Sequence, residues 1–296
     1  MINRIASKLR STREDFSRKL NDEWPRSHFW AYRRMVKEQD RRFRGAGPSP
    51  ASDYHDLDGK LVDRRAIIDE LLREGVAVLP YRLFSGQWTA DLDRGIRDLK
   101  EKYSRGELEA AMLHGGEFGY DKSLVNTGIV RLYHIDRELP AAGDFARHEL
   151  LQSLGEEYLG KKLSLLTTIA QYNEVSDPPC RGFHIDSWVE QVKAFVYLTD
   201  VDENNGPFSY VAKSHLNTNW KLRKMFNGYR SQFDKTRDYG DVTGFADEEV
   251  AKTGLEIKRF PAKAGTVILA DTRGVHEGAS LLEGTRTALV NYYFTA

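Results

Sequence analysis

The chain has 296 residues, 40% of them apolar and 30% charged, and its formal net charge is zero, so the composition predicts a folded core and no nucleic-acid partner. A single cysteine, Cys180, excludes an internal disulfide framework and suits a reducing compartment. No apolar run approaches the ~20 residues of a transmembrane helix, and the N-terminus lacks the apolar segment of a secretory signal, so we expect a cytoplasmic protein.

The first predicted element is a basic helical arm with a linker, residues 1–60. Residues 1–44 hold 13 Lys and Arg against 6 Asp and Glu, and their loosely spaced apolar residues indicate a helix that Pro25 should interrupt. Residues 45–56 read as a turn-rich linker. The arm either packs on the main domain or on a second subunit, or meets anionic lipid or an anionic substrate, or is disordered. An oligomer and a peripheral location at the membrane surface are therefore open alternatives.

Helices dominate the next part of the chain. Residues 64–75 form a short amphipathic helix that ends at Gly75, the strand VAVLP follows, and residues 85–113 return to a helical pattern. Residues 105–160 mix short helices with loops. These helices are expected to buttress a sheet within one domain, residues 61–296.

After residue 160 the pattern changes to short β-branched and aromatic runs separated by Gly, Pro, Asn and Asp. Such runs are typical of strands in an antiparallel sandwich or barrel. The runs are LSLLTTIAQYNEV, VKAFVYLTDVD, GPFSYVA, LEIKRF, GTVILAD and RTALVNYYF. The sequence therefore predicts a mainly β fold with flanking helices.

The tripeptide His-Ile-Asp occurs twice, and one copy is a candidate metal site. Side chains two apart on a strand point the same way, so His-x-Asp offers two ligands together. The copy at residues 134–136 runs into a loop-like tail and is expected to be ordinary. The copy at residues 184–186 lies between predicted strands, and His276 follows a later strand of the same part. Two imidazoles and one carboxylate form the ligand set of non-haem Fe(II) oxygenases, which leaves three positions open.

A basic residue extends this candidate site. Arg286 lies ten residues after His276, in the strand RTALVNYYF, and can pair bidentately with a dicarboxylate such as 2-oxoglutarate. The spacing alone is also compatible with two unrelated histidines. The same three ligands with a metal-bound water would suit a zinc-dependent hydrolase. A catalytically inactive barrel that binds a ligand is the third alternative.

These motifs resemble the phytanoyl-CoA dioxygenase family of Fe(II)- and 2-oxoglutarate-dependent oxygenases. The resemblance covers residues 62–296 and is carried by four segments of the β-rich part and one earlier segment. The segments are 184–186, 197–215, 265–279, 285–294 and 71–87. It implies a double-stranded β-helix, the jelly-roll or cupin-like core of the family.

The resemblance also implies the chemistry and the residues that perform it. His184, Asp186 and His276 would bind iron as the catalytic centre. Arg286 would hold the distal carboxylate of 2-oxoglutarate. The reaction would consume O2 and 2-oxoglutarate, release succinate and CO2, and hydroxylate an unactivated C–H bond.

The finer co-substrate contacts are also implied by the resemblance. The family's polar contact on the strand before His-x-Asp falls near Thr168 and Tyr172, which share a strand face. Gly278 departs from the family, because several relatives place a hydroxyl there. Asp186 favours hydroxylation, because halogenating relatives carry a small residue at that position.

The substrate is expected to be a small molecule, either anionic or lipid-linked. Both the arm and residues 216–255, a predicted lid, are rich in Lys and Arg. No feature of the sequence indicates a nucleic acid as partner.

Overall fold

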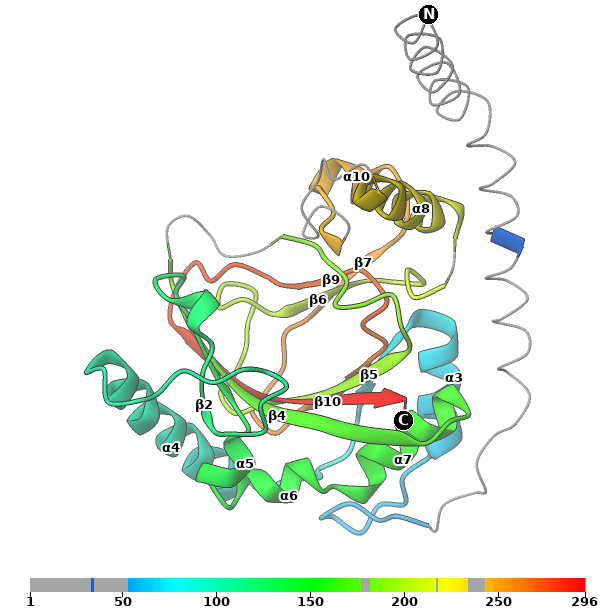
Figure 1. Ribbon diagram of the computed structural model, residues 1–296. Helices are drawn as coiled ribbons and strands as arrows, with labels where there is room; N and C mark the ends of the chain where they lie inside the picture. The colour runs from blue at the N-terminus through cyan, green and yellow to red at the C-terminus, as the bar shows by residue number, and fades with distance from the viewer. Residues whose placement is uncertain (1–32, 35–52, 177–181, 217, 234–242, 296) are drawn as a thin grey trace, which may run out of the picture. The chain divides into compact units, whose positions relative to one another are not determined.

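The computed structural model describes only part of the chain (Figure 1). The described residues are 33–34, 53–176, 182–216, 218–233 and 243–295. Apart from Arg33 and Arg34, the predicted arm of residues 1–44 lies outside them. Within the described part, none of the helices combines the length and apolar content that crossing a bilayer requires.

The chain divides into two compact units, which we call the core unit and the small unit. The core unit comprises residues 44–216 and 243–296, and the small unit comprises residues 1–43 and 217–242. The small unit contains helix α8 (Asn219–Phe233). The predicted lid spans both units and includes residues outside the described part, so it stays a prediction.

The core unit combines short helices with two sheets. Its helices are α3 (Arg64–Glu74), α4 (Gly86–Ser104), the 3-10 turn η1 (Lys122–Leu124), α5 (Ile135–Glu138), α6 (Ala142–Ala146), α7 (Glu149–Leu159) and α10 (Asp247–Ala251). Its strands are β1 (Val76–Leu79), β2 (Gly119–Tyr120), β3 (Ile129–Tyr133), β4 (Leu163–Glu174), β5 (Gln191–Tyr197), β6 (Phe208–Val211), β7 (Ile257–Phe260), β8 (Val267–Ala270), β9 (His276–Gly278) and β10 (Thr285–Thr295).

Both sheets are antiparallel. The large sheet has seven strands in the order β1-β8-β5-β10-β4-β3-β2, and the small sheet has three in the order β7-β6-β9. The long strand β10 lies at the middle of the large sheet and pairs with β4 on one side and β5 on the other. Its register places Arg286 opposite Asn173 of β4, and Tyr292 opposite Lys193 of β5.

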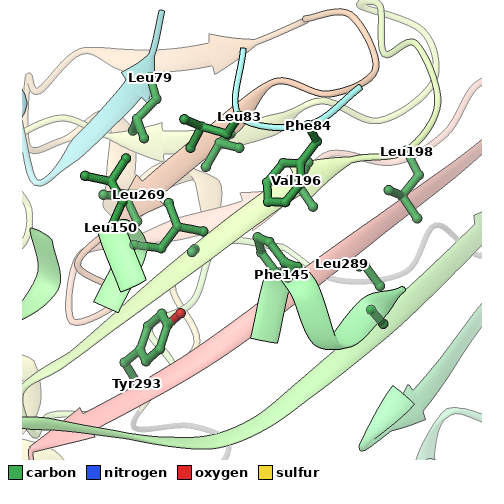
Figure 2. Packing of buried hydrophobic residues seen from close by; sticks show 14 of the residues in the cluster. Leu79, Leu83, Phe84, Phe145, Leu150, Val196, Leu198, Leu269, Leu289 and Tyr293 are labelled. Carbon is green, nitrogen blue, oxygen red and sulfur yellow. The ribbon is translucent and has the colours of Figure 1, made fainter. Parts of the chain in front are cut away.

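One face of the large sheet packs against the helices. Every second residue of the central strands points to this face, as the period of two requires. Figure 2 shows Phe145 of α6 and Leu150 of α7 among side chains of the sheet such as Val196 and Leu269. Full burial of one such side chain contributes about 1.5–3 kcal/mol to the free energy of unfolding. The helices therefore hold the large sheet in place, as the sequence predicted.

The other face of the large sheet packs against the small sheet. Phe208 and Tyr210 of β6 are buried against Tyr197 and Ile268 of the large sheet. The Tyr197 hydroxyl joins the two sheets, because it donates to the Phe260 carbonyl at 3.1 Å and accepts from the Phe208 amide at 2.9 Å. The space between the two sheets is where the candidate site lies.

Local signals explain where the first helices end. Gly75 ends α3 in the left-handed region at φ 85°, and a Cβ there would lie 2.4 Å from both His215 Nδ1 and Tyr210 Oη. Helix α4 ends at Ser104, earlier than the predicted residue 113, because Gly106 follows with φ 72°. The runs predicted as strands are confirmed, but β3 was not foreseen, because it lies in a part of the chain that read as helices and loops.

Candidate functional site

The two histidines of the candidate metal site are joined through their backbones. The His184 amide donates to the His276 carbonyl at 2.9 Å, and the His276 amide donates to the His184 carbonyl at 2.9 Å. The Asp186 amide donates to the carbonyl of Thr272 at 3.1 Å. Residues about 90 positions apart in the sequence are thus fixed beside each other by three backbone hydrogen bonds. The second His-Ile-Asp copy meets His276 as the sequence predicted.

Hydrogen bonds set the tautomer of both imidazoles. His184 Nδ1 lies 3.1 Å from the Gly182 carbonyl, and His276 Nδ1 lies 2.9 Å from the Gly274 carbonyl. A carbonyl oxygen only accepts, so each Nδ1 carries a proton, and Nε2 is the ring nitrogen that is turned to the other ligands. This arrangement prepares both Nε2 atoms to bind a metal.

The donor atoms converge on a single point. One ligand atom from each of His184, Asp186 and His276 lies within 4.8 Å of the others, and among the described residues no other group of this kind occurs. Asp186 Oδ2 is buried and lies 3.3 Å from His276 Nε2. Two imidazole nitrogens and a carboxylate oxygen that converge in this way fit a divalent cation such as Fe(II).

Charges around Asp186 keep it ionised. Burial alone would raise its pKa, but Lys193, His276 and His184 together hold the pKa well below its usual range. Lys193 Nζ forms an ion pair with Asp186 Oδ2 at 2.6 Å. The carboxylate is therefore in the form that binds a cation.

The first His-Ile-Asp copy has a different role. His134 ends β3 and begins α5 in the left-handed region, at φ 53° and ψ 41°. Its amide donates to Thr167 Oγ1 at 3.2 Å, and burial lowers the pKa of its side chain. This copy forms the turn between β3 and α5, in agreement with the prediction that it is not a metal site.

Arg286 is a buried cation near the same cavity. Its side chain donates from Nη2 to Asn173 Oδ1 at 3.1 Å, and burial lowers its pKa. Among the described residues, no carboxylate lies within ion-pair distance of it. A buried guanidinium paired only with an amide is suited to bind a carboxylate from a ligand.

Gly278 makes room for this guanidinium. A Cβ on Gly278 would lie 2.9 Å from Arg286 Nη2. Because Gly278 has no side chain, the Arg286 guanidinium can lie against β9.

The positions of Thr168 and Tyr172 correct one expectation. Thr168 donates from Oγ1 to Asn291 Oδ1 at 2.7 Å, and Asn291 donates in turn to the Phe145 carbonyl of α6. Tyr172 packs in the same helix-facing core. Neither side chain lines the cavity. Alternate residues of β4 point to opposite faces of the sheet, and Thr168 and Tyr172 are on the face that packs against the helices. Asn173 of β4 faces the cavity instead.

The cavity brings the metal ligands and Arg286 together. Its apolar wall includes aromatic side chains from the two sheets. The lining residues include His184, Asp186, Lys193, Phe195, Phe208, His276, Arg286, Val290 and Tyr292. An apolar wall with a few converging polar groups is typical of a small-molecule site.

Sequence reasoning missed several polar residues of the cavity, among them Arg131 of β3, Asn173 of β4 and Lys193 of β5. Arg131 and Lys193 each interrupt a short apolar strand, IVRLY and QVKAFVY. A charge in the middle of a buried strand is unusual, and it was the available signal for both.

A second buried network supports His276. Asp271, at the end of β8, accepts from Tyr158 Oη at 2.8 Å and from Arg273 Nε at 3.0 Å, and is fully buried. The Tyr210 hydroxyl donates to the Asp271 carbonyl at 2.7 Å. The turn that carries His276 is therefore fixed to α7 and β6.

Comparison with known proteins identifies relatives of this arrangement. The sequence model of the family described as phytanoyl-CoA dioxygenase (PhyH) matches residues 72–282. A comparison with curated protein sequences gives no match.

Several solved structures share the fold. The epimerase SnoN, solved in complex with Fe3+, alpha ketoglutarate and nogalamycin RO, is 18% identical, with a TM-score of 0.58 over 79% of this chain and 84% of SnoN. The carbocyclase SnoK from nogalamycin biosynthesis is 17% identical, with a TM-score of 0.56 over 78% of this chain and 84% of SnoK. EctD from S. alaskensis, solved with bound Fe, is 16% identical, with a TM-score of 0.56 over 84% of this chain and 81% of EctD. These likenesses confirm the predicted jelly-roll, cupin-like core.

Proposed function

Because this chain belongs to the phytanoyl-CoA dioxygenase family of iron- and 2-oxoglutarate-dependent oxygenases, we propose that it hydroxylates an unactivated C–H bond of a small molecule at an iron site made by His184, Asp186 and His276. The enzyme is a non-haem iron dioxygenase that uses Fe(II), 2-oxoglutarate and O2. When bound, these supply the oxidising chemistry, in which one oxygen atom of O2 enters the substrate and the other enters succinate as CO2 is released.

One observation carries the residue assignment. The three donor atoms lie within 4.8 Å of one another in a cavity that also holds the buried Arg286. Both imidazoles present Nε2, and the carboxylate is ionised. This set would hold a cation that could supply the oxidising chemistry at the wall of the cavity.

Arg286 is proposed to orient the co-substrate. Its guanidinium can pair with the distal carboxylate of 2-oxoglutarate, and Asn173 holds the guanidinium in place at 3.1 Å. The apolar wall excludes water from the bound co-substrate, which strengthens this ion pair. Thr168 and Tyr172 are not part of this proposal, because both face the helices.

The carboxylate ligand favours hydroxylation over halogenation. His184, Asp186 and His276 would all hold the cation, and the Asp186 carboxylate would take the place that a halide would need. SnoN is described as an epimerase and SnoK as a carbocyclase. Proteins that share this fold therefore catalyse different reactions, and the residues of each site decide which one.

The domain arrangement and the basic arm complete the proposal. We propose residues 61–296 as the dioxygenase domain and residues 1–44 as an arm outside it. The end of the predicted linker belongs to the core unit, because the Leu57 amide donates to the Arg82 carbonyl at 2.9 Å. From its charge, residues 1–44 either contact anionic lipid or pack on the domain or a second copy.

Succinate release tests the function directly. The protein is loaded with Fe(II) and 2-oxoglutarate without oxygen, air is admitted, and succinate is measured in the wild type and in His276→Ala and Asp186→Ala. We expect slow succinate formation in the wild type and at least about a hundredfold less in both variants, because each loses a metal ligand.

Metal and co-substrate binding serve as the second readout. Titration calorimetry should show one Fe(II) per chain in the wild type and much weaker binding in either variant. Equal succinate formation by the variants and the wild type would contradict the residue assignment. A wild type that binds zinc tightly and ignores 2-oxoglutarate would contradict the oxygenase itself.

A further inference from the structure

The cavity holds two cations besides Arg286. Lys193 of β5 and Arg131 of β3 both line it, and the lysine side chain is only 4% exposed. In the register of the large sheet, Lys193 lies opposite Tyr292, six residues along β10 from Arg286. At ~3.3 Å per residue this separates the two positions by about 20 Å along the strand. Lys193 and Arg286 therefore lie toward different ends of the cavity.

Lys193 has hydrogen-bonding capacity left over. Its Nζ pairs with Asp186 Oδ2 at 2.6 Å and lies 3.7 Å from the centre of the Tyr292 ring. An ammonium group has three donors, and one contact with a carboxylate oxygen leaves two. The aromatic ring stabilises the cation without using a donor. The ammonium can therefore bind a second anion beside the metal ligand.

Arg131 is also incompletely paired. Its Nη2 donates to Gln171 Oε1 at 3.3 Å, and its Nη1 lies 3.8 Å from Asp121 Oδ2. Its buried Nε has no hydrogen-bond partner among the described residues. A guanidinium with five N–H donors is thus held by one neutral contact and one long ion pair.

The charges of the loaded site leave a positive excess. The two charges of Fe(II) cancel those of 2-oxoglutarate, and Asp186 cancels Arg286. Glu174 also lines the cavity, but it pairs with Lys100 at 3.2 Å. Asp121 then offsets only one of Arg131 and Lys193. A buried positive charge is costly unless an anion pairs with it.

We propose that Lys193 and Arg131 bind an anionic group, a carboxylate or a group of similar charge, on the primary substrate. This inference rests on the proposed function and specifies its substrate class. The anion would be held next to the metal ligands, so the C–H bond that reacts would lie close to the charged group. Phe195 and Tyr292 would contact the apolar part of the same molecule.

Three small aromatic probes test the charge preference. Benzoate, benzyl alcohol and benzylamine have one ring each and differ in charge, and the ring suits the aromatic wall. Their binding to the anaerobic complex with Fe(II) and 2-oxoglutarate is measured by titration calorimetry. We expect a Kd for benzoate at least about tenfold below those of the other two, because only benzoate pairs with the excess cations.

Two variants and a control locate the binding. Lys193→Met and Arg131→Met should each raise the benzoate Kd about tenfold and leave the 2-oxoglutarate Kd within about twofold. Lys258→Met is the control, because Lys258 pairs with Glu74 at 3.3 Å outside the cavity, and it should change neither value. Melting curves check that each variant is folded.

The outcomes separate this inference from the proposed function. Equal binding of benzoate and benzyl alcohol by the wild type would overturn the anion site, and so would unchanged benzoate binding in both variants. If either variant lost 2-oxoglutarate or iron binding, the substituted residue would belong to the co-substrate or metal site. This result would also overturn the anion site. A wild type that binds neither iron nor 2-oxoglutarate would overturn the proposed function, and this inference with it.

Discussion

Arg286 and Gly278 show how single residues set the co-substrate end of the cavity. The guanidinium is 5% exposed and pairs with a neutral amide, so its desolvation is uncompensated until an anion binds. Gly278 allows this position, because any side chain there would displace the guanidinium. The buried positive charge of Arg286 therefore favours the binding of an anionic ligand.

Substitutions at these two positions should weaken 2-oxoglutarate binding to different degrees. Arg286→Met removes the cation and should raise the Kd for 2-oxoglutarate about 100-fold. Gly278→Ala keeps the cation but places a Cβ 2.9 Å from Nη2, and should raise the Kd about tenfold. Titration calorimetry of the Fe(II) protein without oxygen measures both values.

Gly86→Ala is the matched glycine control, because a Cβ there meets nothing within 4 Å. It should leave the Kd unchanged. An Arg286→Met variant that binds 2-oxoglutarate as tightly as the wild type would show that another residue holds the distal carboxylate.

The turn between β8 and β9 shows how a structural element positions the proposed metal ligand His276. Asp271 is fully buried and accepts hydrogen bonds from Tyr158 and Arg273, and the turn then continues to His276. Ser214 Oγ accepts from the Val275 amide at 2.7 Å, one residue before His276. The metal ligand is thus positioned by contacts from α7 and from the turn after β6.

Asp271→Asn should destabilise the protein by about 1.5–3 kcal/mol, because it weakens a charged hydrogen bond to Arg273, whose side chain is 17% exposed. The free energy of unfolding from urea titration measures this. Asp200→Asn is the control, since Asp200 pairs with Lys263 at 2.7 Å on the surface, where the two side chains are 61% and 86% exposed. An exposed pair contributes about 0–1 kcal/mol. Equal losses in the two variants would show that the buried network does not stabilise this turn.

At the scale of the whole molecule, the residues of both proposed sites belong to the core unit. The metal ligands, Arg286, Lys193 and Arg131 all lie in residues 44–216 and 243–296. The basic arm contributes none of them. Binding of the co-substrate should therefore be independent of the arm.

Removal of residues 1–44 should leave the Kd for 2-oxoglutarate within about twofold of the full chain, because no contact residue is lost. The same variant distinguishes the roles of the arm. Sedimentation with vesicles of phosphatidylcholine, with and without phosphatidylserine, tests lipid contact, and light scattering tests a second copy. A large rise in the Kd would show that the arm contributes to the site.

The sequence by itself determined the mainly β fold class, and it led us to propose His184, Asp186 and His276 as the metal ligands with Arg286 nearby. The strand periodicity and the order of the motifs were sufficient for these predictions. The runs that form β8 and β10 and the second His-Ile-Asp copy can each be recognised from a short stretch of sequence. The sequence also placed the helices before the sheet. Each of these signals is local in the chain, whereas the meeting of His184 with His276 is a contact between residues about 90 positions apart.

Only the tertiary structure decided which faces of the strands point into the cavity. Strand β4 is buried on both faces, so its pattern does not distinguish them, and a shift of one residue exchanges Thr168 and Tyr172 for Asn173. The pairing of β3 with β4 brings Arg131 to the cavity, and that pairing joins residues 40 positions apart. The charge excess around Lys193 likewise exists only after distant strands meet, because an ion pair depends on distance in space rather than along the chain.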